Sequence, residues 1–81
     1  MDPISTQVMV DDVSEIRTQL KNDYWNLHSK LAKESYKDSG KQLEDQLTLG
    51  KIATAQKQAA DLASTLGDLN TQAYQAINKN K

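Results

Sequence analysis

His28 is the only histidine of the chain, and the sequence has no cysteine. A lone imidazole beside Trp25 has no second histidine or cysteine at the spacing that a zinc site needs. We therefore expect His28 to be a partly exposed helix residue. Disulfides, thiolate metal sites and a cysteine nucleophile are excluded, although the missing cysteine leaves the redox compartment undetermined.

The carboxylates that could act as an acid-base pair are adjacent in sequence, in Asp11-Asp12 and Glu44-Asp45. General acid-base catalysis requires acids that converge in a pocket. These pairs lie near predicted helix starts instead, where acids offset the positive end of the helix dipole. The chain has no phosphate-binding loop, nucleophile elbow, metalloprotease motif or calcium loop. We expect no catalytic, cofactor-binding or metal-ligating residue, and hence no enzyme.

The charges are balanced, with 10 basic and 11 acidic side chains and a net charge of -1. Nucleic-acid binding usually needs a basic stripe. Here Lys30, Lys33 and Lys37 alternate with Glu34 and Asp38, whose charges cancel most of such a field. We expect no nucleic-acid partner.

The longest strongly apolar segment is Val8-Met9-Val10, far shorter than the ~18 residues of a membrane span. The opening Met1-Asp2-Pro3 has neither the basic nor the apolar region of a signal peptide. We expect a protein without membrane contact that is cytoplasmic, or exported without a cleaved signal peptide.

The first half of the chain predicts one amphipathic helix. Its apolar residues recur at steps of three and four, as in a helix and not a strand: Met9, Val13, Ile16, Leu20, Tyr24, Leu27 and Leu31. Asp12 and Glu15 form a capping-box pattern, which predicts the helix start at Asp12. The helix should end near Lys37, before Gly40. Residues 1–11 are then a flexible arm, and residues 12–81 a single helical domain.

The second half continues the helical period without error, through Ile52, Ala55, Ala59, Leu62, Leu66, Leu69, Ala73 and Ala76. Ser39 with Gln42 can open this region. The pattern alone favours one long helix, whereas Gly50 and Gly67 each favour a helix end. The fold class is all-α. We favour a small antiparallel bundle of three to four helices over the alternative, a long two-helix antiparallel hairpin.

The core of such a domain must be thin, because 81 residues without phenylalanine bury little apolar area. Contacts with a partner can bury the apolar area that the chain alone leaves exposed. On a helical wheel Trp25, Ala32 and Tyr36 cluster away from the leucine stripe, and small residues line another face of the second half. The partner-binding candidates are Trp25, Ala32, Tyr36, Ala53, Ala60 and Ser64. We expect a non-enzymatic protein-protein interaction module that binds another protein or itself.

Spacing over residues 10–79 resembles a known family. The segment Gly50-Lys51-Ile52-Ala53-Thr54-Ala55, followed by Leu62, is similar to the order seen in helix pairs of helical-repeat proteins. The longer spacing is similar to the C-terminal helical bundle shared by the steroid receptor RNA activator protein and the outer-coat subunit of COPII vesicles. This resemblance implies a several-helix interaction bundle without enzymatic activity. Ala73-Tyr74-Gln75-Ala76-Ile77 stands where that family has a tryptophan-centred motif.

In length and composition the chain also resembles the helical hairpins of bacterial secretion systems. That likeness implies the alternative function, a self-assembling or secretion-associated structural protein. Asn26 and Leu27 follow Trp25, where the type VII secreted hairpins have a Trp-x-Gly turn. Neither likeness transfers a functional residue to this chain.

Overall fold

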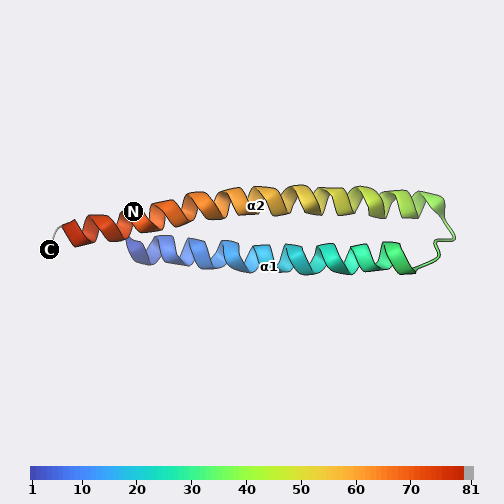
Figure 1. The fold of residues 1–81 in the computed structure, drawn as a ribbon, viewed down its shortest axis with the longest axis horizontal. Coiled ribbons are helices and arrows are strands. Elements are labelled where there is room, and N and C mark those ends of the chain that lie inside the picture. Colours follow the sequence, from blue (N-terminus) through green and yellow to red (C-terminus); the bar gives the residue numbers. More distant parts are fainter. Residues whose placement is uncertain (80–81) are drawn as a thin grey trace.

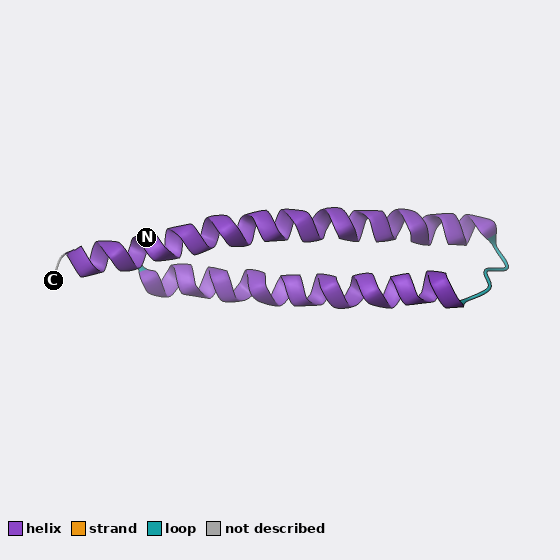
Figure 2. Cartoon of the chain, in the orientation of Figure 1, coloured by secondary structure: helices purple, strands orange, loops and turns teal. Residues whose placement is uncertain are grey.

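The protein is a hairpin of two long antiparallel helices in the computed structural model, which describes residues 1–79 (Figure 1). Helix α1 spans Pro3–Lys33 and helix α2 spans Ser39–Lys79. Across the described residues there is no strand, and a single segment, residues 34–38, connects the helices (Figure 2). The all-α class is confirmed. The chain adopts the hairpin alternative, and the favoured bundle of three to four helices is wrong for the single chain.

Helix α1 begins at Pro3, so the predicted start at Asp12 is wrong. Asp2 is the N-cap: its carboxylate accepts hydrogen bonds of 2.9 Å from both the backbone N–H and the hydroxyl of Ser5. Proline is suited to the first helical position, where its missing N–H would have no partner within the helix. Residues 3–11, assigned to a flexible arm in the sequence analysis, thus belong to α1.

The connection between the helices also differs from its prediction. Helix α1 ends at Lys33 and not near Lys37, because Glu34 turns into an extended conformation with φ -88° and ψ 141°. Asp38 then caps α2, and its Oδ1 accepts from the backbone N–H groups of Gly40 at 2.8 Å and Lys41 at 3.4 Å. Gly40 therefore opens a helix and does not end one.

Gly50 and Gly67 lie inside α2 and end no helix. Neither glycine has a positive φ, and the helix continues through both to Lys79. The unbroken three-and-four period of the second half was therefore the better guide to its structure than the two glycines.

Each helix contributes one row of residues to the seam between them, and we call these rows the core rows. In α1 the row is Pro3, Thr6, Val10, Val13, Arg17, Leu20, Tyr24, Leu27 and Leu31; in α2 it is Gln42, Asp45, Leu49, Ile52, Gln56, Ala59, Ala63, Leu66, Asn70 and Ala73. All of these residues are buried or half-buried except Arg17. Steps of three and four alternate strictly, which is the heptad spacing of a coiled coil.

The core rows are narrower than the apolar stripes predicted from the sequence. Four large members of those stripes remain substantially exposed: Met9 at 38%, Ile16 at 53%, Leu62 at 49% and Leu69 at 37%. They occupy the helix position immediately before a core-row residue. One neighbouring helix covers only the seam, whereas a stripe that includes this extra position is typical of helices with more than one neighbour.

The interior position of the two glycines predicts that alanine stabilises the hairpin. Nothing lies within 4 Å of a Cβ built on Gly50 or Gly67. We expect Gly50→Ala and Gly67→Ala each to raise the free energy of unfolding by up to about 1 kcal/mol. Thermal unfolding followed by circular dichroism measures this. Gly40→Ala is the matched control, because its Cβ would lie 3.1 Å from the capping Asp38 Oδ1; it should give no such gain.

Candidate functional site

A buried carboxylate holds the connecting segment against the helices. Asp45 is only 6% exposed. Its Oδ2 accepts a 2.8 Å hydrogen bond from the Tyr36 hydroxyl and lies 3.2 Å from Lys30 Nζ, while Oδ1 lies 3.4 Å from Lys41 Nζ. We call these four residues the clasp. It joins α1, the connecting segment and α2 at one end of the hairpin.

The clasp shifts the ionisation of its own members. The hydrogen bond from Tyr36, supported by Lys30 and Lys41, holds the pKa of the Asp45 carboxyl below its ordinary value of 3.8. Burial raises the pKa of Tyr36 to about 12, and the hydrogen bond to Asp45 acts in the same direction. Asp45 therefore remains a charged acceptor and Tyr36 a neutral donor at neutral pH, which is the pairing that a structural contact requires.

A second polar contact lies at the opposite end of the seam. Thr6 is fully buried, and its Oγ1 accepts a 2.8 Å hydrogen bond from Asn70 Nδ2. The same hydroxyl is 3.1 Å from the carbonyl oxygen of Pro3, to which it donates. Because Thr6 and Asn70 are both core-row residues, this bond fixes which turns of the two helices face each other.

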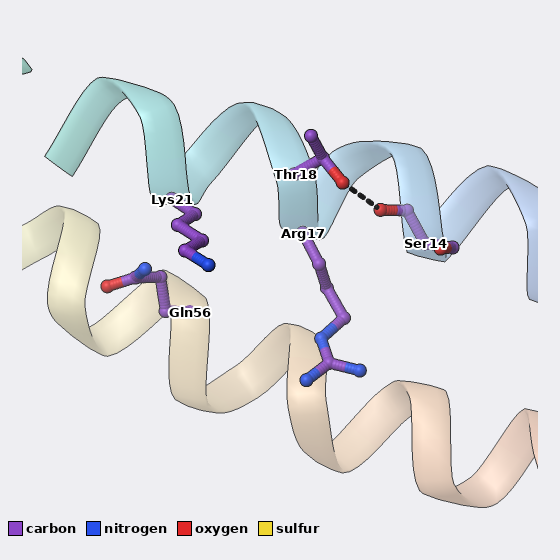
Figure 3. A pocket seen from close by; sticks show the side chains of 5 residues that line it. All are labelled: Ser14, Arg17, Thr18, Lys21 and Gln56. Atoms are coloured by element: carbon purple, nitrogen blue, oxygen red, sulfur yellow. Dashed lines mark hydrogen bonds between the residues drawn. The ribbon is translucent and has the colours of Figure 1, made fainter. Parts of the chain in front are cut away.

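A polar recess opens beside the middle of the seam. It has a volume of ≈ 280 Å³ and is lined by Ser14, Arg17, Thr18, Lys21 and Gln56. Figure 3 shows Arg17 and Lys21 extending from α1 toward α2, while the Thr18 hydroxyl turns back to bond the Ser14 carbonyl at 3.2 Å. The lining holds no carboxylate or histidine. Neither a carboxylate nor an imidazole is therefore available in the lining to act as a general base beside the Ser14 and Thr18 hydroxyls.

Aromatic side chains gather on α1 near the clasp. The Trp25 ring lies edge-on to Tyr24 at 5.3 Å and to His28 at 5.2 Å between centroids. Trp25 is 53% exposed. His28 thus packs within an aromatic cluster, and no group of three or more potential metal ligands occurs in the part of the chain that the structure describes.

The predicted patch of Trp25, Ala32 and Tyr36 does not form as one helical surface. Tyr36 lies beyond the end of α1 and belongs to the clasp. The three residues would share a face only if α1 continued to Lys37, whereas it ends at Lys33. Trp25 and Ala32 do lie on α1 and are exposed.

The other candidates fall on the same side of the hairpin as Trp25. Ala53 and Ala60 each lie one position past a core-row residue of α2, and Ser64 lies one position past Ala63. Ala53 and Ser64 are exposed and Ala60 is half-buried. We call this side the Trp25 face, and it also includes Ala32 and the polar recess.

The opposite side carries larger aliphatic residues, and we call it the aliphatic face: Met9, Ile16, Leu62 and Leu69. All four residues occupy the same heptad position, immediately before a core-row residue. The two helices of an antiparallel pair are related by a local two-fold axis, which places this position of both helices on the same side of the pair. The Thr6–Asn70 bond shows which turns of the two helices lie at the same height along the hairpin. Counted from that bond in opposite directions along the two chains, Met9 lies within one turn of Leu69, and Ile16 lies within one turn of Leu62. This face was not predicted, because all four residues were expected in the core. Its signal in the sequence is the width of the apolar stripes, which include one more helix position than a single neighbouring helix can cover.

Neither helix contains, among the residues described, a segment long and apolar enough to cross a membrane. Comparisons of the chain with protein-family models, with curated proteins and with solved structures found no match. The resemblance to the steroid receptor RNA activator and COPII family therefore stays a prediction.

The clasp predicts a specific pH dependence of stability. The lowered pKa of Asp45 means that its contribution is present above pH 3.8 and is lost as the pH falls through the folded-state pKa. The raised pKa of Tyr36 means that its contribution is complete below pH 10.0 and is lost as the pH rises through about 12. Melting temperature measured across the pH range should fall at both limits.

Substitutions separate the two effects. Asp45→Asn should lower the melting temperature at neutral pH, because Lys30 and Lys41 lose their counter-ion, and should weaken the fall in acid. Tyr36→Phe should remove the alkaline fall. Glu44→Gln is the matched control, because it removes a neighbouring carboxylate that also lies near Lys41, at 3.6 Å, but whose side chain is 70% exposed. An Asp45→Asn protein as stable as the control would contradict the clasp.

Trp25 should contribute little to folding, since about half of its surface remains in solvent. We expect Trp25→Ala to destabilise the hairpin by less than the ~3–5 kcal/mol that a buried aromatic costs. Its fluorescence should be red-shifted and quenched by iodide. A shielded, blue-shifted Trp25 in the isolated monomer would show that this face is covered by the chain itself.

Proposed function

We propose that the protein is a non-enzymatic helical interaction module, and that its hairpin forms part of a larger bundle completed by another polypeptide. The observation that carries this proposal is the exposed aliphatic face. Beside its core row each helix has two large exposed apolar residues, Met9 and Ile16 in α1 and Leu62 and Leu69 in α2, and such a widened stripe is typical of helices in bundles. One hairpin supplies a neighbour only for the first row.

The surface area of the hairpin supports this proposal. The chain exposes 6158 Å², whereas a compact monomer of its 9.0 kDa mass exposes about 4900 Å². Its radius of gyration is 18.5 Å, compared with about 12 Å for a compact domain of this length. Few apolar residues of the described chain are buried: Val13, Leu66 and Ala73. A second surface packed on the hairpin would bury the apolar area that the single chain leaves in water.

The aliphatic face is a better partner surface than the Trp25 face. Its four residues are large and lie at matching levels of the two helices, Met9 beside Leu69 and Ile16 beside Leu62. Their side chains need no polar partner. The Trp25 face also carries exposed apolar side chains, but the charged recess of Arg17 and Lys21 divides them into two groups, Ile4 with Tyr74 and Trp25 with Leu43. Trp25, Ala32, Ala53, Ala60 and Ser64 remain the candidates for a second contact, and the position of Tyr36 in the clasp removes it from that surface.

The alternative function is that of a self-assembling or secretion-associated structural hairpin. The elongated form of 66 × 14 × 14 Å favours it, because such a rod can pack side by side with copies of itself. Both functions use the same apolar surface. They differ in whether the polypeptide that covers it is a different protein.

Site-specific photo-crosslinking in the native cell tests the proposed module. A photoreactive residue at Ile16 or at Leu62 should give covalent adducts with another polypeptide, either a different protein or another copy of the chain. The matched control positions are Val8 and Leu47, which are 53% and 61% exposed but project away from the seam. Adducts confined to the aliphatic face support the proposal. Equal labelling at all four positions, or none at any, overturns it.

A further inference from the structure

We infer that a second copy of this chain covers the aliphatic face, with the two hairpins related by a two-fold axis parallel to their helices. This inference rests on the proposed function and names the partner. In the dimer α1 of each copy packs against α2 of the other, and both connecting segments lie at the same end. The product is an antiparallel four-helix bundle.

The side of the hairpin that carries the aliphatic face is large enough for a dimer. The molecule is 66 Å long and 14 Å wide, so two hairpins packed along their length can bury an area comparable with the ~800 Å² per partner of a standard interface. The aliphatic residues themselves span seven positions of each helix, about 10 Å, in the middle of that contact. The area that the hairpin exposes beyond that of a compact monomer is of the same order. A two-fold contact of this size therefore removes part of the excess area that each hairpin exposes.

The apolar residues repeat at the levels that this symmetry requires. Met9 and Leu69 share one level of the hairpin, and Ile16 and Leu62 share the next. A two-fold axis parallel to the helices keeps every residue at its own level. It therefore places Met9 against Leu69 of the partner subunit and Ile16 against Leu62 of the partner subunit, and both layers become purely aliphatic.

The charges beside the apolar layers are complementary in the same arrangement. Lys33 comes to the level of Glu44 of the partner subunit at the border of the face. Asp23, which follows Ile16 along the face by two helical turns, lies within one turn of Lys51 of the partner subunit. Two-fold symmetry produces each of these pairs twice. Such pairs contribute mainly to the choice of partner and orientation.

The opposite orientation is disfavoured by charge. A two-fold axis perpendicular to the helices would put α1 against α1 of the partner subunit with the connecting segments at opposite ends. Superposing the aliphatic residues would then centre the axis between Met9 and Ile16, which brings Asp12 beside Asp12 of the partner subunit. Like charges at that distance oppose association.

Sedimentation equilibrium of the purified chain tests the dimer. We expect a mass of twice 9.0 kDa at micromolar concentration. The double variant Ile16→Glu/Leu62→Glu should sediment as a monomer and keep its helical circular dichroism, because both side chains are exposed in the hairpin. Val8→Glu/Leu47→Glu introduces the same charges at equally exposed outward positions and should remain dimeric. A monomeric wild-type chain, or equal loss of dimer in both variants, would overturn the inference.

Cysteine cross-linking tests the orientation, and the chain has no cysteine of its own to interfere. A mixture of the Lys33→Cys and Glu44→Cys proteins treated with a short bismaleimide should give the mixed dimer at least tenfold faster than Asp12→Cys links to itself. The reverse ratio overturns the proposed axis. Reversing both charges, in Lys33→Glu/Glu44→Lys, should preserve the dimer, whereas Lys33→Glu alone should weaken it in low salt.

The two proposals fail differently. If the purified chain is a monomer while photoreactive Ile16 captures a different protein in the cell, the homodimer is overturned and the interaction module stands. If the chain is a monomer and no adduct forms at Ile16 or Leu62, both are overturned. A wild-type dimer that Ile16→Glu/Leu62→Glu dissociates supports both.

Discussion

The hairpin depends on contacts that define one register between its two antiparallel helices, because the heptad spacing of the seam is the same at every repeat. The Thr6–Asn70 bond and the Asp45 clasp are these contacts, and they lie at opposite ends of the seam. Each is a buried polar group with its partners present. A shifted register would leave Asn70 or Asp45 without them, which is costly because a buried polar group loses its hydration whether or not it finds a partner.

The register in turn creates the aliphatic face. Because the Thr6–Asn70 bond sets the levels, Met9 falls beside Leu69 and Ile16 beside Leu62, and four residues from distant parts of the chain form one surface. The hairpin cannot cover this surface itself, since each helix has only one neighbour. The face is exposed because each helix carries apolar residues beside its core row and has only one neighbour within the chain.

Much of the fold was predictable from local patterns. The three-and-four spacing established the all-α class, and it was right that the second half could be a single helix. Predictions failed where two local signals competed. The Asp12–Glu15 capping pattern predicted the helix start, although Asp2 caps the helix; Gly50 and Gly67 were given too much weight as helix ends; and Tyr36 was placed on a helix that ends at Lys33. Among the candidate residues, Asp45 was assigned to the helix dipole, and nothing in its immediate neighbours revealed that Tyr36 and Lys30 converge on it.

The sequence by itself determined the helical period, the absence of cysteine chemistry and the excess of apolar positions over those that one seam can bury. Those properties depend on residue types and on spacing along a single helix. Only the tertiary structure decided which of the apolar rows is buried, that Asp45 is a buried structural carboxylate, and which residues form the aliphatic face. The reason is physical: burial depends on the register between two helices, and that register is set by contacts between them, such as the bond of Thr6 with Asn70, which is 64 positions away in the sequence.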